Sequence, residues 1–414
     1  MLPLLVTTVR LVVFLLTYAL IAVQQFPGLR LNRPAASLLG AVAMVTVGGL
    51  PLGEAYAAID LNVIVFLLGV LLLTAYLELG GFFEWAATWI VARVRSPRAL
   101  LAAIVASSGL LSALFINDTI CLVFTPLLVP ALRALGLRPL PFLLALAFAA
   151  NVGSALTITG NPQNMLIGVS SGIHYGAFAA ALALPTVGGL AIVYGVIRVA
   201  FRRDLAVALV AAPLAEAPLD RPLVLKALAL FGAALAGWLA GLSLPLVAIA
   251  AGAVMVAIAG RDPDQAFARV EWSLLLFFAA LFIVVRGVRD LPLFVDLTTR
   301  ASGALVGAPW HDATVIAAAM TALSNLVSNV PAVMLWRPVV PTVPNAELAW
   351  LAMAMSSTFA GNLTVLGSMA NLIVAERAAA RGVRIGFREV LRVGVPVTLL
   401  TLAWGIASLV LVRG

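Results

Sequence analysis

One stretch of the chain places hydroxyl, amide and glycine residues where an apolar helix would be expected. Residues 151–164 read Asn-Val-Gly-Ser-Ala-Leu-Thr-Ile-Thr-Gly-Asn-Pro-Gln-Asn, inside an apolar segment over about 141–169. Lipid gives backbone groups no hydrogen-bond partners, so an interrupted helix at membrane depth must line a cavity or be enclosed by protein. The pattern predicts a broken helix whose unwound centre binds a small polar solute or an ion.

A second stretch, residues 358–371, repeats this pattern as Thr-Phe-Ala-Gly-Asn-Leu-Thr-Val-Leu-Gly-Ser-Met-Ala-Asn within about 348–375. Superposing the two stretches pairs Thr157 with Thr364, Gly160 with Gly367 and Asn164 with Asn371. The central glycines permit a tight unwound turn. Half-helix N-termini favour anions, whereas exposed carbonyl groups favour Na⁺. We interpret the stretches as two halves of one site; helix packing through small residues is the alternative.

Two further polar interruptions predict re-entrant hairpins, over about 99–132 and about 313–340. The first is split by Asn117-Asp118-Thr119 and the second by Ser328-Asn329-Val330-Pro331. An ionisable group at membrane depth is costly, so Asp118 is a candidate for proton or cation binding. Asn329 takes the place of Asp118 in the second interruption, which predicts one charged and one neutral tip. The alternatives are an Asp118 that only caps a helix and a kink set by Pro331.

The predicted site combines these four segments. Its predicted substrate-binding residues are Asn117, Thr119, Asn151, Ser154, Thr157, Thr159, Asn161, Asn164, Ser328, Asn329, Asn362, Thr364, Ser368 and Asn371. Its predicted ion-coupling residues are Asp118, Gly160 and Gly367, with Na⁺ at Asp118/Gly160 and Asn329/Gly367 as one option and a transported proton as the other. No cofactor and no other metal is expected.

The composition supports a polytopic membrane protein. The chain has 414 residues, of which 63% are hydrophobic and 10% charged, whereas soluble domains have roughly 45–50% and about 25%. One cysteine excludes an internal disulfide, and two histidines offer no zinc-binding spacing. The chain also lacks a phosphate-binding Gly-rich loop, a His cluster and a Ser–His pair, so it is predicted not to be an enzyme or an ATP-driven pump.

The apolar segments predict an all-α architecture with about 11 transmembrane segments, arranged as an inverted repeat with two re-entrant hairpins and two broken helices. We assign residues 1–204 to the first repeat, 205–222 to a cytoplasmic linker, and 223–414 to the second repeat. The net charge of +8 comes mostly from loop arginines, which the positive-inside rule places in the cytoplasm. The exceptions to this assignment are Arg286, Arg289, Arg300 and Arg337. The predicted location is a bacterial-type inner membrane.

The sequence of 151–164 resembles the broken-helix signature of the ion transporter superfamily. This group includes citrate-transporter-like permeases, dicarboxylate symporters, arsenite-efflux permeases and one class of sodium/proton antiporters. The resemblance covers nearly the whole chain and implies a scaffold, a mobile transport domain with elevator-type movement, and a homodimer. Dicarboxylate symporters carry Ser-Asn-Thr at both hairpin tips, whereas the tips here differ. Asn117-Asp118, followed by Thr125-Pro126, is similar to the arsenite-permease branch and favours proton coupling.

We therefore predict a secondary transporter of a small anion or oxyanion, coupled to H⁺ or Na⁺. The alternatives are a Na⁺/H⁺ antiporter, an arsenite efflux permease and an anion channel. An antiporter would move Na⁺ or Li⁺ as its only substrate. A channel would give a flux that neither saturates nor depends on a second ion.

Overall fold

The computed structural model describes residues 2–23, 31–210 and 217–413, and the regular secondary structure in this part of the chain is all helical, without a β-strand. Arg30 and the centre of the predicted linker 205–222 lie outside the described residues. The helices of the first half are α1 (Leu2–Val23), α2 (Arg33–Thr46), α3 (Leu52–Ala58), α4 (Leu61–Leu79), α5 (Phe82–Arg93), α6 (Pro97–Leu114), α7 (Asn117–Ala134), α8 (Leu140–Ser154), the 3₁₀ turn η1 (Ile158–Gly160), α9 (Pro162–Ser171) and α10 (Tyr175–Ala200).

The helices of the second half follow the same order of long and short elements. They are α11 (Arg221–Leu239), α12 (Leu244–Ile258), α13 (Pro263–Phe267), α14 (Trp272–Arg289), α15 (Pro292–Gly303), α16 (Pro309–Val327), α17 (Asn329–Trp336), the 3₁₀ turns η2 (Val340–Thr342) and η3 (Ala360–Asn362), α18 (Ala346–Phe359), α19 (Met369–Ala379) and α20 (Phe387–Arg413). Apart from α7 and α17, with 18 and 8 residues, counterparts such as α10 and α20 have similar lengths, here 26 and 27 residues.

Seven of the described helices are long and apolar enough to cross a membrane, and three further apolar helices are shorter. The seven are α1, α4, α6, α10, α11, α14 and α20, and the shorter ones are α2, α8 and α12. The predicted all-α polytopic fold is thus confirmed. Helix α6 and helix α7 have 18 residues each, or about 27 Å at 1.5 Å per residue, and the first helix pair extends slightly beyond the predicted range of about 99–132 at both ends.

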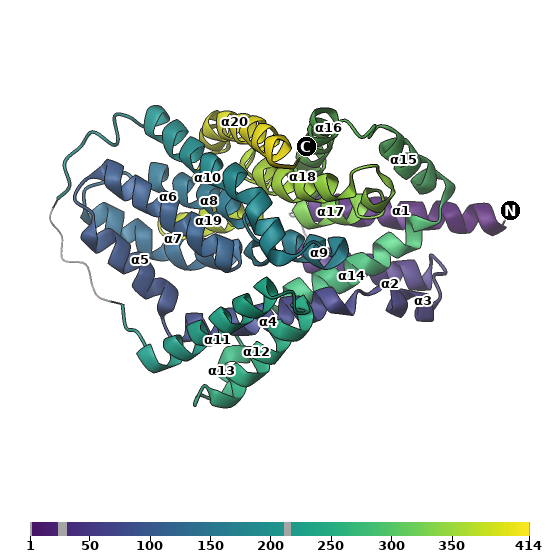
Figure 1. The fold of residues 1–414 in the computed structure, drawn as a ribbon, viewed down its shortest axis with the longest axis horizontal. Helices are drawn as coiled ribbons and strands as arrows, with labels where there is room; N and C mark the ends of the chain where they lie inside the picture. Colours follow the sequence, from purple (N-terminus) through teal and green to yellow (C-terminus); the bar gives the residue numbers. More distant parts are fainter. Residues whose placement is uncertain (1, 24–30, 211–216, 414) are drawn as a thin grey trace.

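The helices form two bundles, and each half of the chain contributes to both (Figure 1). The first, called here the framework bundle, consists of α1–α4 and α11–α14, in which α2 packs on α14 and α4 packs on α12. The second, called the site bundle, consists of α6–α10 and α16–α20, in which α6 packs on α8 and α10 on α20. The close approach of α4 and α12 depends on Gly69, because a Cβ atom there would lie 2.3 Å from the backbone of Ala248.

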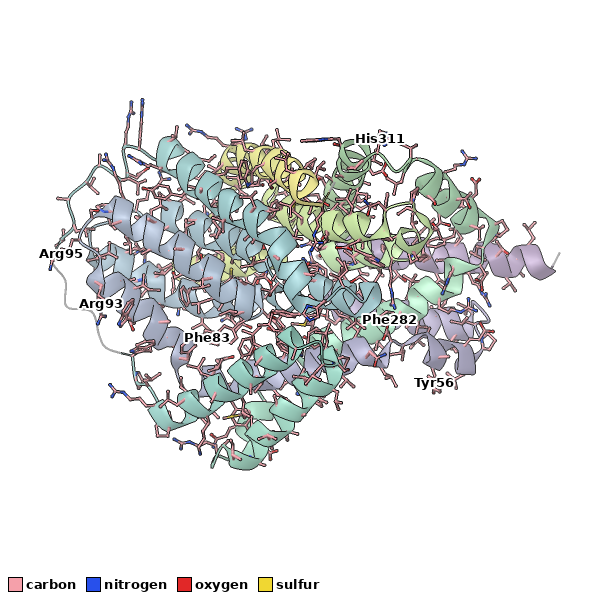
Figure 2. All side chains as sticks on the ribbon, viewed as in Figure 1. Tyr56, Phe83, Arg93, Arg95, Phe282 and His311 are labelled. Carbon is pink, nitrogen blue, oxygen red and sulfur yellow. The ribbon has the colours of Figure 1, made fainter. Side chains whose placement is uncertain are left out.

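The charged loops gather at two opposite ends of the molecule. At one end Arg138 lies 3.2 Å from Glu389 and 3.8 Å from Asp204, which brings together the loops after α7 and α10 and the first turn of α20. Figure 2 shows Arg93 and Arg95 at this end and Tyr56 toward the other. Ion pairs at the other end join α14 to α3 through Arg286 and Glu54, and α17 to the start of α4.

Candidate functional site

Each of the two predicted broken helices is interrupted by an unwound turn that an asparagine closes. In the first, α8 ends at Ser154, and Asn161 caps α9 by accepting a hydrogen bond from the Asn164 backbone N–H at 2.8 Å. The Asn164 side chain then donates from Nδ2 to the carbonyl oxygens of Ser154 and Thr157, at 3.2 and 3.0 Å. These bonds satisfy carbonyl groups that the end of α8 leaves without helical partners.

The second turn repeats this geometry residue by residue. Asn371 Nδ2 donates to the carbonyl oxygens of Gly361 and Thr364, at 2.8 and 2.9 Å. Its carbonyl partners lie 10 and 7 residues earlier in the chain, as they do for Asn164. Ser368 caps α19, as Asn161 caps α9. The shared pattern of Thr, Gly and Asn in the two stretches thus encodes the same local structure twice.

Asn151 connects the two turns across the centre of the site bundle. Its Nδ2 donates to Asn362 Oδ1 at 2.8 Å and Asn371 Oδ1 at 3.1 Å. Its Oδ1 accepts from Ser368 Oγ at 2.8 Å and from Asn117 Nδ2 at 3.2 Å. All five side chains are buried. One amide therefore joins the first hairpin tip to both halves of the predicted site.

We expect Asn151→Ala to lower the thermal stability of the purified protein strongly. The substitution removes the partner of several buried polar groups, and each such group costs about 1–3 kcal/mol when left without a hydrogen bond. The measurement is the thermal unfolding midpoint in detergent, with Asn62→Ala at an exposed position as the control. Equal midpoints for the two variants would contradict this role of Asn151.

The two hairpin tips differ in backbone conformation. Helix α7 begins at Asn117 after an extended Phe115. Helix α17 begins at Asn329, and the preceding Ser328 has φ 78° and ψ 161°, a region that only glycine occupies readily. Counted from the first residue of each helix, Asn329 corresponds to Asn117 and Val330 to Asp118. The expected equivalence of Asn329 and Asp118 is therefore wrong by one residue, because the polar residue types alone did not determine where each helix begins.

We expect Ser328→Gly to raise the unfolding midpoint of the protein or leave it unchanged, and Ser328→Val to lower it. Among the described residues Ser328 is the single non-glycine residue with positive φ, and this strain costs about 1–3 kcal/mol. Glycine relieves the strain, and a β-branched side chain increases it. Comparing both variants by thermal unfolding tests the conformation, since equal midpoints would be incompatible with it.

The hairpin tips and the second half-helices surround a cavity of about 270 Å³. Five predicted site residues line it, namely Asn117, Asp118, Ser328, Asn329 and Ser368. The other predicted residues lie behind it in the buried network or within the unwound turns: Thr119, Asn151, Ser154, Thr157, Thr159, Asn161, Asn164, Asn362, Thr364, Asn371, Gly160 and Gly367. Thr159, for example, meets the Tyr175 hydroxyl at 2.8 Å, away from the cavity.

Several polar residues at the cavity were not among the predicted ones. Arg33 and Glu271 come from the starts of α2 and α14 in the framework bundle, and Gln163 comes from α9. Arg33 and Glu271 read in the sequence as loop charges next to apolar segments, so no local signal marks them. Asn325 on α16 was also missed; its amide donates to the Ala360 carbonyl at 2.9 Å, and its Oδ1 accepts from Thr364 at 3.1 Å.

A larger cavity of about 830 Å³ opens toward the other end of the molecule. It is lined by α14 residues such as Phe282 and Arg286, and by Met334 and Arg337 near the end of α17. Phe282, labelled in Figure 2, is buried. Helices α14 and α17 therefore line both cavities, with an apolar stretch of each helix between them. A solute that crossed the molecule would have to pass this apolar segment or be carried around it.

Comparison with known proteins places these observations among membrane transporters. Residues 18–360 match the family model described as "Citrate transporter". A "46 kDa membrane protein" of Mycobacterium leprae is 30% identical over 96% of both chains. The silicon efflux transporter LSI3 of Oryza sativa is 30% identical and covers 92% of this chain and 93% of its own. The crystal structure of the Alcanivorax borkumensis YdaH transporter has the same fold, with a TM-score of 0.59, 19% identity and 98% coverage of both chains.

Proposed function

Because this chain belongs to the citrate transporter family, we propose that it is a secondary active transporter of a small anion or oxyanion, coupled to protons. The observation that carries the proposal is the polar cavity between the two hairpin tips and the second halves of the two broken helices, α9 and α19. Asn117, Ser328, Asn329 and Ser368 supply hydroxyl and amide groups for an oxygen-rich solute, and Asp118 supplies the ionisable group. The volume of about 270 Å³ fits a small solute, since pockets that bind drug-sized ligands have volumes of about 300–1,000 Å³.

Protons are favoured over Na⁺ by the state of the carbonyl groups in the unwound turns. A Na⁺ ion would use such carbonyl oxygens as ligands. Here the carbonyls of Ser154 and Thr157, and those of Gly361 and Thr364, already accept bonds from asparagine amides. Asp118 therefore becomes the main candidate for ion coupling, with Arg33 and Glu271 as the other charged groups at its cavity. One buried acceptor, Asn164 Oδ1, has no hydrogen-bond partner. Because this oxygen could be a ligand for Na⁺, the counterflow experiment below includes a Na⁺ gradient.

The orientation in the membrane follows from the two charged ends of the molecule. The basic loops after α5, α7, α10 and α19 would face the cytoplasm of a bacterial-type inner membrane. The cavity around Asp118 then opens toward the cytoplasm, because α2 and α14 begin there. The exceptions Arg286 and Arg337 would lie outside, where they pair with Glu54 and Asp60 at 2.7 and 2.6 Å.

The mechanism we propose is elevator-type movement of the site bundle past the framework bundle. Matching helix lengths and the repeated asparagine geometry support two structural repeats, 1–204 and 223–414, inverted with respect to each other. A homodimer, implied by the superfamily resemblance, would anchor the framework bundle. The similar rice protein is named a silicon efflux transporter. This name favours export as the direction of transport, and an oxyanion or its acid as the solute.

Counterflow in proteoliposomes tests this function. The solutes are dicarboxylates, citrate, phosphate, sulfate, arsenite, silicic acid and Na⁺, each with and without imposed H⁺ and Na⁺ gradients. Saturable exchange of one oxygen-rich solute, driven by the H⁺ gradient, is the expected result. Movement of Na⁺ alone against H⁺ would indicate an antiporter, and a flux that does not saturate would indicate a channel.

A further inference from the structure

Arg33 joins the framework bundle to the second half of the site. It is the first residue of α2 and is 7% exposed. Its Nη1 donates to Ser328 Oγ at 3.0 Å, and its Nη2 donates to the Leu366 carbonyl at 3.4 Å. Ser328 forms the second hairpin tip, and Leu366 lies in the second unwound turn. One guanidinium therefore reaches both parts of the site that the second half of the chain builds.

Arg33 also supplies the positive charge in the lining of the cavity. Among the described residues that line the cavity, Asp118 and Glu271 are the carboxylates and Arg33 is the single basic side chain. An anion or the oxygen atoms of an oxyacid would need a positive group to offset these two carboxylates. Guanidinium has a planar fork of donors that matches carboxylate and other oxyanions, so Arg33 has the chemistry for this role.

The bonds from Arg33 to Ser328 and to Leu366 can be exchanged for a solute. A serine hydroxyl and a backbone carbonyl are neutral acceptors, and hydrogen bonds to charged groups are roughly twice as strong as those between neutral groups. An oxyanion entering the cavity would therefore compete with Ser328 Oγ for the guanidinium. Release of Ser328 would also free a hairpin tip that the backbone holds in a strained conformation.

Arg33 and the other binding groups belong to different bundles. Asp118, Asn329 and Ser368 are carried by the site bundle, whereas α2 packs on α1 and α14 in the framework bundle. Movement of the site bundle would carry the solute away from Arg33. The solute would then meet the guanidinium when the site is open at the end where α2 begins, and would not meet it after the movement.

We propose that Arg33 is a one-sided substrate-binding residue, which raises the affinity for an oxygen-rich anionic solute on the cytoplasmic side only. This inference rests on the proposed elevator transport and adds a specificity-determining residue to it. The asymmetry helps export, because the solute is bound tightly where it is captured and weakly where it is released.

The test is the KM for the transported solute on each face of oriented vesicles, measured with the wild-type protein and with Arg33→Gln and Arg33→Lys. We expect Arg33→Gln to raise the cytoplasmic KM by about tenfold or more, as loss of a charge-assisted hydrogen bond does, and to leave the outer KM within about twofold. Arg33→Lys keeps the charge without the planar fork, so its cytoplasmic KM should lie between those of the wild-type protein and Arg33→Gln. Arg10→Gln is the matched control, because Arg10 also belongs to the framework bundle and donates to two backbone carbonyls, at 2.7 and 2.9 Å.

A merely structural role of Arg33 would change the two KM values together or lower the maximal rate alone, and either result would overturn the proposal. Unchanged kinetics in Arg33→Gln would overturn it as well. If Arg33→Gln does not fold, the cytoplasmic and outer KM values of Arg33→Lys are compared with those of the wild-type protein instead, and the same criteria apply. The proposed function fails separately, on the wild-type protein, if no solute shows saturable exchange.

Discussion

Asp118→Asn is expected to abolish solute accumulation driven by a proton gradient while solute exchange continues. The asparagine resembles the protonated carboxyl in size and neutrality, but it has no proton to bind or release. Coupling to one proton allows about tenfold accumulation per unit of pH difference, since one unit corresponds to about 1.4 kcal/mol. In the variant this ratio should fall to about one. The measurement is the ratio of internal to external solute in proteoliposomes with an imposed pH difference.

Asp312→Asn is the matched control for this prediction. Asp312 is buried and Asp118 is half-buried, and each lies in the first turn of a hairpin helix, Asp312 in α16 and Asp118 in α7. It accepts hydrogen bonds from the backbone N–H groups of Val306 and Gly307, at 2.9 and 2.8 Å, outside the Asp118 cavity. The control should keep its pH-driven accumulation per folded molecule. Tenfold accumulation that persists in Asp118→Asn would remove Asp118 from the coupling mechanism.

Gly160→Val is expected to stop transport altogether. A Cβ atom at position 160 would lie 2.2 Å from the carbonyl oxygen of Ser154 and 2.8 Å from the Ser154 Cα. These are backbone atoms at the end of α8, so they cannot rotate away as a side chain would. The unwound turn would have to open, and Asn164 would lose the geometry of its bonds to the Ser154 and Thr157 carbonyls.

The initial rate of counterflow measures this effect, with protein amount in the membrane determined in parallel. Gly195→Val on α10 is the matched control, because a Cβ atom there meets nothing within 4 Å. We expect normal flux for the control and a loss of about 100-fold or more for Gly160→Val; a steric clash costing about 3 kcal/mol already corresponds to this factor. Normal flux in Gly160→Val would show that the turn does not depend on glycine.

The local structure of the site was predictable because it is encoded locally. The Thr, Gly and Asn residues shared by 151–164 and 358–371 form each unwound turn. The glycine permits the tight backbone, and the asparagine side chain bonds to two carbonyl groups of the turn. These residues lie within about ten positions of one another. The hairpin tips were likewise marked by polar residues in apolar surroundings. The register of the second tip was missed because Ser328, with its positive φ, precedes the helix that begins at Asn329.

The tertiary part of the site was not predictable from these signals. Arg33 and Ser328 are 295 positions apart, and their contact depends on how α2 packs against α14 and beside the site bundle. Glu271 reaches the cavity for the same reason. The sequence marks both residues as charges at the ends of apolar segments, a pattern that membrane topology explains equally well.

The internal pH of proteoliposomes during solute flux is the deciding measurement. A pH-sensitive dye is enclosed with the wild-type protein or with Asp118→Asn, and the solute identified by counterflow is added without Na⁺. Proton-coupled transport predicts a saturable change of internal pH in the wild-type vesicles and none in the variant, although solute still exchanges there. Solute flux in the wild-type vesicles without any pH change, or an equal pH change in both proteins, would contradict proton coupling through Asp118.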